Sequence, residues 1–126
     1  MRRLIAAAVL AAVIVSVCVV GQQVIRRCGQ EVGALLMESM EAAQNGDTET
    51  AAQKAALAEE TFTERENKLN FFIRHDLVED LGSQLAKLKD LATEETASEF
   101  LSEAGSAVIM LTHVVDDERP TFLNIF

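Results

Sequence analysis

The sequence predicts an all-α protein in which an N-terminal transmembrane helix precedes a small antiparallel bundle of about four helices, arranged as two helical hairpins. An uncharged apolar run opens the chain, from Leu4 to Gly21. Beyond it, apolar residues recur three and four positions apart in successive segments, which is the spacing of one helix face. No segment shows the alternation of apolar and polar residues that is typical of a half-buried strand.

The opening run is long enough to cross a bilayer as a helix. The stretch "LIAAAVLAAVIVSVCVVG" rises about 1.5 Å per residue and spans about 27 Å, close to the thickness of the hydrocarbon layer. The next four residues extend it to Ile25. We therefore expect a membrane anchor over residues 1–27, with residues 4–25 in contact with the membrane, and an acidic helical-bundle domain over residues 28–126.

The stretch "VSVCVVGQQV", residues 15–24, raises the question of processing, because small and polar residues follow the apolar run. A cleavable signal has a shorter apolar core of about 7–15 residues. Lipid attachment at Cys18 favours a small preceding residue, and Val17 is not small. The residues favour an uncut anchor, with cleavage and lipidation as the two alternatives.

Paired arginines flank the anchor on both sides, Arg2 and Arg3 before it and Arg26 and Arg27 after it. The N-terminal amine adds to the first pair, whereas Glu31 offsets the second. The positive-inside rule then favours a single-pass protein of the cytoplasmic membrane with an extracytoplasmic C-terminal domain.

The charge of the chain is strongly asymmetric. The net charge is −9, but from Cys28 onward seven basic residues oppose twenty acidic ones, a formal charge of 7 − 20 = −13. Such a surface repels phosphate backbones and anionic headgroups, so no nucleic acid is expected as a partner. A cationic partner, or a role in solubility alone, fits better.

The first helix is expected to continue out of the membrane to about Gln44. Its apolar positions beyond the anchor are Cys28, Val32, Leu35, Leu36, Met40 and Ala43. The tripeptide "NGD" then ends it, because Gly46 suits the left-handed position after a helix and Asp47 can cap the next one.

Three further amphipathic helices follow. The second carries Ala51, Ala55, Ala58, Phe62, Leu69 and Phe72, interrupted by Arg65, and its alanines imply close packing against a neighbour. The third is expected to start at Asp76 as its cap, with Glu79 completing a capping box, and carries Leu77, Leu81, Leu85, Leu88 and Leu91. A threonine or serine caps the fourth, which carries Phe100, Leu101, Ala104, Val108, Leu111 and Val115 and cannot continue through Pro120.

Two features bear on self-association. Ala8, Ala12 and Ser16 form a row of small residues on one face of the anchor, which lets two membrane helices approach closely, although an alanine-rich helix also contains such rows by chance. Cys18 and Cys28 lie about 15 Å apart on one helix, beyond disulfide reach, so we expect free thiols or, alternatively, a Cys28 bridge between two chains.

One constellation of side chains is able to carry chemistry. His75 precedes Glu79, and His113 precedes Asp117, by four residues, which places each pair on one helix face. Antiparallel third and fourth helices would bring the two pairs together, as ligands for zinc or a similar divalent ion. The alternative is structural, with histidines that serve helix ends and Glu79 engaged in the capping box.

Glycine loops for phosphate, serine-elbow motifs and paired CxxC motifs are all missing from the sequence, so we expect neither an enzyme nor a cofactor. The tail "RPTFLNIF" ends on four large apolar residues, Phe122, Leu123, Ile125 and Phe126. It either folds back over the open end of the bundle or docks on a partner, and the acidic surroundings favour the first.

The arginine-led anchor, the "NGD" turn, "FFIRHD" entering "LVEDLGSQLAKLKDL", and "EFLSEAGSAVIMLTHVVDDERPTFLNIF" together resemble a family of small bacterial, single-pass, all-helical proteins catalogued as a domain of unknown function. The resemblance covers nearly the whole chain, most specifically residues 71–126. It implies an anchored helical domain and no established activity.

These features predict a non-catalytic protein–protein interaction or structural module of the bacterial cell envelope. It would bind another protein or a second copy of itself. The alternative is a ligand- or metal-binding sensor domain that uses His75, Glu79, His113 and Asp117.

Overall fold

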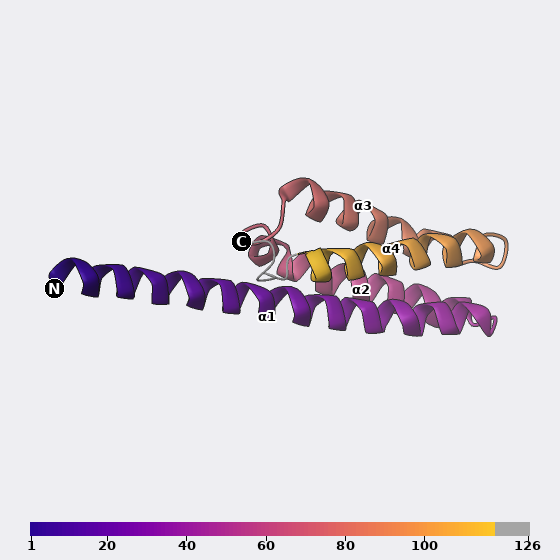
Figure 1. The fold of residues 1–126 in the computed structure, drawn as a ribbon. Helices are drawn as coiled ribbons and strands as arrows, with labels where there is room; N and C mark the ends of the chain where they lie inside the picture. Colours follow the sequence, from indigo (N-terminus) through magenta and orange to yellow (C-terminus); the bar gives the residue numbers. More distant parts are fainter. Residues whose placement is uncertain (118–126) are drawn as a thin grey trace.

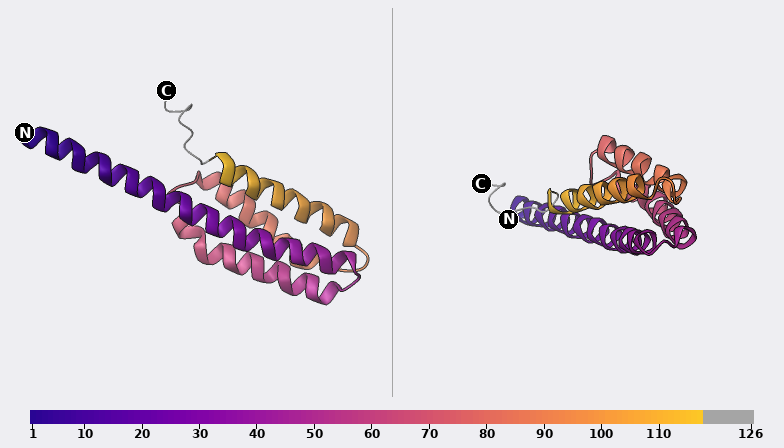
Figure 2. Two further views of the ribbon diagram at one scale, coloured as in Figure 1. Left: turned by 60° about the horizontal axis from the view of Figure 1, so that its bottom comes forward. Right: turned by 90° about the vertical axis from the view of Figure 1, so that its right-hand side faces the viewer.

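The computed structural model describes the backbone of residues 1–117 and the side chains of residues 1–115. Four helices make up this part: α1 (Arg2–Gln44), α2 (Thr48–Leu69), α3 (His75–Leu91) and α4 (Ala97–Asp117). They form an antiparallel bundle, and α1 extends far beyond it toward the N-terminus (Figures 1 and 2). The prediction of an all-α protein with four packed helices is confirmed, whereas Pro120 and the apolar tail lie outside the described residues.

The bundle is closed, because each helix packs on its neighbours in the chain and α1 also packs on α4. It has two ends. The proximal end, on the side of the N-terminus, holds the α2–α3 turn (residues 70–74) and the end of α4. The distal end holds the α1–α2 turn at residues 45–47 and the α3–α4 turn at residues 92–96.

Helix α1 is one uninterrupted helix with two different surroundings. Every residue from 1 to 20 is exposed, and residues 2–20 are called the apolar arm below. Burial begins at Gly21 and then recurs at helical spacing along one face, at Ile25, Cys28, Val32, Leu36, Ser39, Ala42 and Ala43. The predicted continuation to Gln44 is confirmed. The predicted domain boundary between residues 27 and 28 stays a prediction, and packing against the bundle starts at Gly21, seven residues before Cys28.

The α1–α2 turn has the predicted geometry. Gly46 adopts φ 81°, in the left-handed region where a Cβ is strained. The N–H of Gly46 donates to the carbonyl of Ala43 at 3.1 Å, and that of Asp47 donates to Ala42 at 2.9 Å, which is the Schellman pattern. The Asp47 carboxylate accepts a hydrogen bond from the Thr50 N–H at 3.1 Å. Hydrogen bonding with the Thr50 side chain, and to a smaller extent with this N–H, lowers the pKa of Asp47. Both the helix end and the cap are confirmed.

The predicted start of α3 at an Asp76 cap is wrong. The capping position is Arg74, with extended backbone (φ −56°, ψ 133°) and no side-chain cap hydrogen bond. The Arg74 carbonyl accepts hydrogen bonds from the N–H groups of Leu77 and Val78. The helix therefore starts at His75, whereas an Asp76 cap would have made Leu77 its first residue. Asp76 lies in the first turn, where its carboxylate pairs with the Arg74 guanidinium at 2.7 Å. The negative charge of this carboxylate also interacts favourably with the positive N-terminal end of the helix dipole.

Phe72 also differs from its predicted place. Helix α2 ends at Leu69, because the next N–H groups turn back by three residues, from Phe71 to Lys68 and from Phe72 to Leu69. Phe72 therefore lies in the α2–α3 turn and not on the apolar face of α2.

The core follows the predicted apolar positions. Phe100, Leu36, Leu85 and Leu88 are fully buried and come from three different helices. Leu35, Met40, Leu77, Leu91, Leu101, Val108 and Val115 are only partly buried at its margin. Residues that the periodicity missed complete the core, namely Ile25, Ile73, Val78, Ala107 and Val114.

Small residues hold α1 and α2 close together. Ala51, Ala55 and Ala58 are 0 % exposed, as the alanine stripe predicted. Ser39 of α1 is also fully buried, and its hydroxyl donates to the carbonyl of Ala51 at 2.6 Å. A side-chain hydroxyl reaches the backbone of the next helix only where the two helices approach closely.

Replacing Ala55 by leucine should destabilise the protein, because added methylenes at a fully buried helix–helix contact cost about 1–3 kcal/mol. Thermal unfolding of the full chain in mild detergent, followed by circular dichroism, measures the change. Gln53→Leu, at an exposed position of the same helix, is the matched control. Equal melting temperatures for the two variants would contradict the close α1–α2 packing.

Candidate functional site

The apolar arm is the most unusual surface of the molecule. Its ten large apolar side chains are exposed by 47–77 %: Leu4, Ile5, Val9, Leu10, Val13, Ile14, Val15, Val17, Val19 and Val20. An 18-residue window in α1 has a mean hydropathy of 2.9, and 6 % of it is buried. Within the described residues, α1 is the one helix that is long and apolar enough to cross a membrane, by length and composition.

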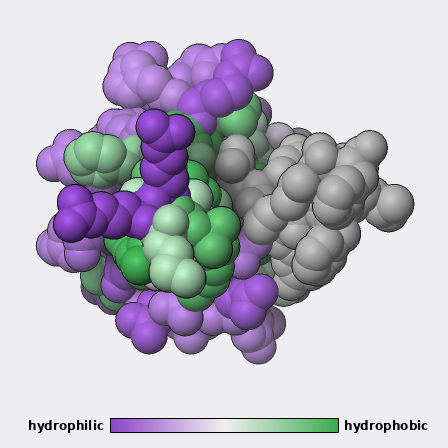
Figure 3. Space-filling model, turned by 60° about the vertical axis from the view of Figure 1, so that its left-hand side comes forward, coloured by the Kyte–Doolittle hydropathy of each residue, from purple (hydrophilic) through white to green (hydrophobic). Residues whose placement is uncertain are grey.

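The space-filling view from the N-terminal side shows hydrophobic residues gathered at the centre of a largely hydrophilic surface (Figure 3). The uncharged part of the arm has 17 residues, from Leu4 to Val20, and rises about 1.5 Å per residue, which gives about 25 Å. This length is close to the thickness of a hydrocarbon layer of about 30 Å.

The junction between the arm and the bundle is a contact between Gly21 and Phe72. A Cβ at Gly21 would lie 2.5 Å from Cδ1 of the Phe72 ring, so the ring rests directly on the backbone of α1. About two helical turns further along α1, a Cβ at Gly29 would lie 2.7 Å from Cγ2 of Val115 on α4. The proximal end is thus fixed to α1 at two glycines. The sequence offered one signal for this junction, a glycine at the end of an apolar helix.

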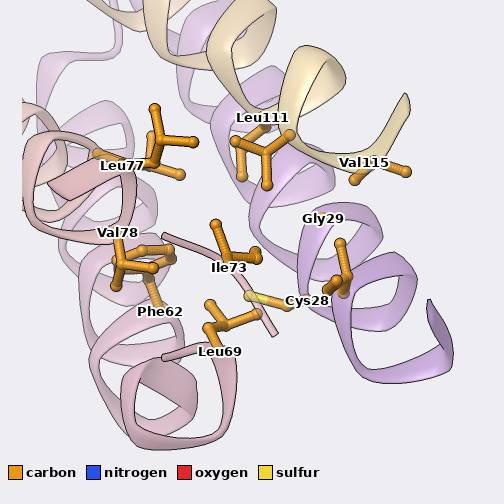
Figure 4. Close-up of a pocket in the computed structure, with 12 residues that line it drawn as sticks. Cys28, Gly29, Phe62, Leu69, Ile73, Leu77, Val78, Leu111 and Val115 are labelled. Carbon is orange, nitrogen blue, oxygen red and sulfur yellow. The ribbon is translucent and has the colours of Figure 1, made fainter. Parts of the chain in front are cut away.

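A small apolar cavity lies inside the proximal end (Figure 4). Its volume is about 10 Å³, and its walls come from all four helices and the α2–α3 turn: Ile25, Cys28, Gly29, Phe62, Leu69, Ile73, Leu77, Val78, Leu81, Leu111, Val114 and Val115. Such a volume admits about one water-sized sphere, whereas small-molecule sites have about 300–1,000 Å³. The cavity as formed is therefore a packing defect and not a ligand site.

A second, more open hollow of about 240 Å³ lies between α1 and α4. Arg26, Gln30 and Thr112 give it a polar rim over apolar walls.

Cys28 lines the apolar cavity and is 2 % exposed. Burial raises the pKa of its thiol to about 11, while the nearby Arg65 guanidinium lowers it and the Glu31 carboxylate raises it by smaller amounts. Cys18 and Cys28 form no disulfide with each other, as their separation predicted, and Cys18 is exposed on the arm. A disulfide between the Cys28 residues of two chains would require the core to open.

The three predicted metal ligands whose side chains the structure describes form no metal-binding group of three. His75, Glu79 and His113 are all exposed, and Nδ1 of His75 lies 3.2 Å from Oδ1 of Asn70. Among the described residues, no group of three or more His, Cys, Asp or Glu side chains lies close enough together to hold a metal ion. The side chain of Asp117 lies outside the described residues, so the four-ligand site stays a prediction.

The fold and its surface define a class of protein, a four-helix bundle whose first helix continues as a long exposed apolar arm. The chain belongs to the family described as a domain of unknown function (DUF4363), whose family model matches residues 19–125. The match starts two residues before the first buried position of α1, so it covers the whole bundle. No curated protein and no solved structure matches the chain.

The burial of Cys28 predicts a slow thiol. At pH 8, a pKa of about 11 instead of 9.0 lowers the thiolate fraction about 100-fold. In Cys18→Ser protein, a thiol-specific reagent should therefore react much more slowly before unfolding in urea than after it. Adding Ser98→Cys, at an exposed position of α4, supplies a fast reference thiol. Equal reaction rates for Cys28 in the folded and unfolded protein would contradict its burial.

Because the unfolded thiol ionises near pH 9 and the folded one near pH 11, the free energy of unfolding should fall as the pH rises between these values.

The metal hypothesis predicts that excess zinc raises the melting temperature of the full chain, because a ligand that binds only the folded state stabilises it by mass action. His75→Ala and His113→Ala should each abolish the shift. Gln53→His, which adds a histidine far from the pair, is the control for nonspecific binding. A shift that survives both alanine variants, or no shift at all, removes the metal site.

Proposed function

We propose that this protein is a single-pass, membrane-anchored interaction or structural module of the bacterial cell envelope, without catalytic activity. The apolar arm crosses the cytoplasmic membrane, and the acidic bundle lies on its extracytoplasmic side. The observation that carries the proposal is the arm itself. It is the exposed N-terminal part of α1, it has apolar side chains on every side, and the same helix continues into the packed bundle.

The energetics of the arm support a lipid environment. Burying one valine, leucine or isoleucine side chain stabilises by about 1.5–3 kcal/mol, so covering ten of them is worth on the order of 10 kcal/mol or more. This amount is comparable to the whole stability of a small domain. A helix that is apolar on every side needs cover on every side, which a bilayer provides without a specific partner.

The charges at the two ends of the arm support the orientation. Arg2 and Arg3 stand at its start, and Arg26 and Arg27 follow nearly two helical turns after it ends. The N-terminal amine strengthens the first group and Glu31 weakens the second, which favours a cytoplasmic N-terminus.

The continuity of α1 favours a module that presents a fixed surface close to the membrane. No flexible linker separates the arm from the bundle, since α1 runs helically from Arg2 to Gln44. The acidic bundle suits a cationic surface of another envelope protein. The row of Ala8, Ala12 and Ser16 on the exposed arm suits pairing with a second copy.

Two charges placed within the arm should abolish stable membrane insertion. Arginine at the centre of a transmembrane helix costs about 2.5–3.5 kcal/mol, so Val9→Arg combined with Val13→Arg costs about 5–7 kcal/mol. Alkaline extraction of washed membranes should leave the unmodified chain in the pellet and release this variant. The bundle should keep its thermal unfolding transition, because neither position contacts it.

Gln53→Arg combined with Ser98→Arg is the matched control, since it adds the same charge at exposed positions of α2 and α4. If alkaline extraction releases the unmodified chain as well as the Val9→Arg, Val13→Arg variant, the proposed anchor is wrong. A separate experiment on intact spheroplasts gives the side of the membrane on which the bundle lies. Protease added outside intact spheroplasts should digest the bundle, and its protection there would reverse the orientation.

A further inference from the structure

We infer that the α2–α3 turn is a second membrane contact, in which Phe71 inserts into the phospholipid interface beside the point where α1 leaves the bilayer. The inference rests on the proposed anchoring by the apolar arm. It assigns a function to a residue that the packing of the bundle does not use.

The position of the turn along α1 is fixed by the contact at Gly21. The ring of Phe72 lies against the backbone of Gly21, which is the first residue after the apolar arm. If the arm fills a hydrocarbon layer of about 30 Å, Gly21 lies at the boundary of that layer. Phe71, one residue before Phe72, is then held at the same boundary.

Phe71 is by far the most exposed large apolar residue of the bundle. Its exposed fraction is 85 %, compared with 60 % for Ile109, 57 % for Met37 and 44 % for Leu57. An aromatic ring at a membrane interface is removed from water without a protein partner.

The exposure of Phe71 follows from the structure of the turn. The N–H of Phe71 donates to Lys68 at 3.3 Å, and those of Phe72 and Ile73 both donate to Leu69, at 3.0 and 2.8 Å. Ile73 is buried in the bundle, at 6 % exposure, and Phe72 packs on α1. Because the next two residues, Phe72 and Ile73, pack inward, Phe71 is the residue of the turn that remains exposed at the proximal end.

Four basic residues lie at this end, together with the carboxylates of Glu66, Asp76 and Glu79. Lys68 closes α2, Arg74 starts α3, and Arg26 and Arg27 follow the arm on α1, all with exposed side chains. Among the described side chains, Lys68, Arg26 and Arg27 form no ion pair, and Arg74 pairs with Asp76. Three other bundle cations each pair with a carboxylate, at 2.9, 2.7 and 3.2 Å: Lys54 with Glu38, Arg65 with Glu31, and Lys89 with Glu59.

Cations beside an exposed aromatic ring suit the phosphate groups of phospholipids. Long lysine and arginine side chains can reach these groups while their stems cover apolar surface. The lipid surface is the occupant that the geometry favours, because the same bilayer already surrounds the arm one residue away from Gly21.

The test uses tryptophan fluorescence of the full chain reconstituted into phospholipid vesicles. The protein has no tryptophan or tyrosine, so each introduced tryptophan reports alone. Phe71→Trp probes the turn. Met37→Trp probes an exposed apolar position of α1 that lies sixteen residues, or about 24 Å, beyond Gly21. Val13→Trp probes the centre of the arm.

Phospholipids brominated on the acyl chains near the headgroup should quench Phe71→Trp and shift its emission to the blue relative to Met37→Trp. Met37→Trp should be quenched by acrylamide in the aqueous phase and not by the brominated lipid. Phospholipids brominated near the chain ends should quench Val13→Trp.

Two results would overturn the lipid contact. Quenching of Phe71→Trp by acrylamide alone would place the turn in water. Blue-shifted emission without quenching by the brominated lipids would show that protein covers the site, from the C-terminal segment or a second copy. Quenching of Val13→Trp together with either result removes this inference and leaves the anchor in place. An unquenched Val13→Trp removes the anchor, and the inference with it.

Discussion

The whole arrangement depends on the continuity of α1, a single helix that serves two environments. Its first half exposes apolar side chains on every side, and its second half buries one face against both α2 and α4. A helical backbone satisfies its own hydrogen bonds in lipid and in a protein core alike, so no break is needed where one environment replaces the other. The position and direction of the bundle therefore follow those of the arm.

Small residues decide where the other helices meet α1. At the distal half, Ala51, Ala55 and the Ser39 hydroxyl allow α2 to approach closely. At the proximal end, Gly21 and Gly29 admit the ring of Phe72 and the side chain of Val115 against the α1 backbone. These contacts set the level of the α2–α3 turn along α1, and with it the level of Phe71.

The distribution of charge fits the same arrangement. Arg26 and Arg27 on α1, Lys68 on α2 and Arg74 on α3 stand at the proximal end, whereas the domain from Cys28 onward is acidic as a whole. Carboxylates also lie at this end, at Glu66, Asp76 and Glu79, and Asp76 pairs with Arg74. Under the proposed anchoring, the cations Arg26, Arg27 and Lys68, unpaired among the described side chains, are the groups that would face lipid phosphate.

The sequence by itself determined the helices, the α1–α2 turn and the membrane-like character of the arm, because periodicity, the Gly46–Asp47 pair and an uncharged apolar run act within a few residues of the chain. Only the tertiary structure decided where α3 begins, that Phe72 leaves α2 to pack on Gly21, and that Phe71 remains exposed. The position of Phe72 depends on a contact with Gly21, about fifty positions away, which local patterns do not encode. The start of α3 depends on backbone hydrogen bonds to Arg74, which the capping-box pattern at Asp76 did not predict. The convergence of His75 and His113 also required a specific rotation of α3 and α4, and helical spacing alone does not fix that rotation.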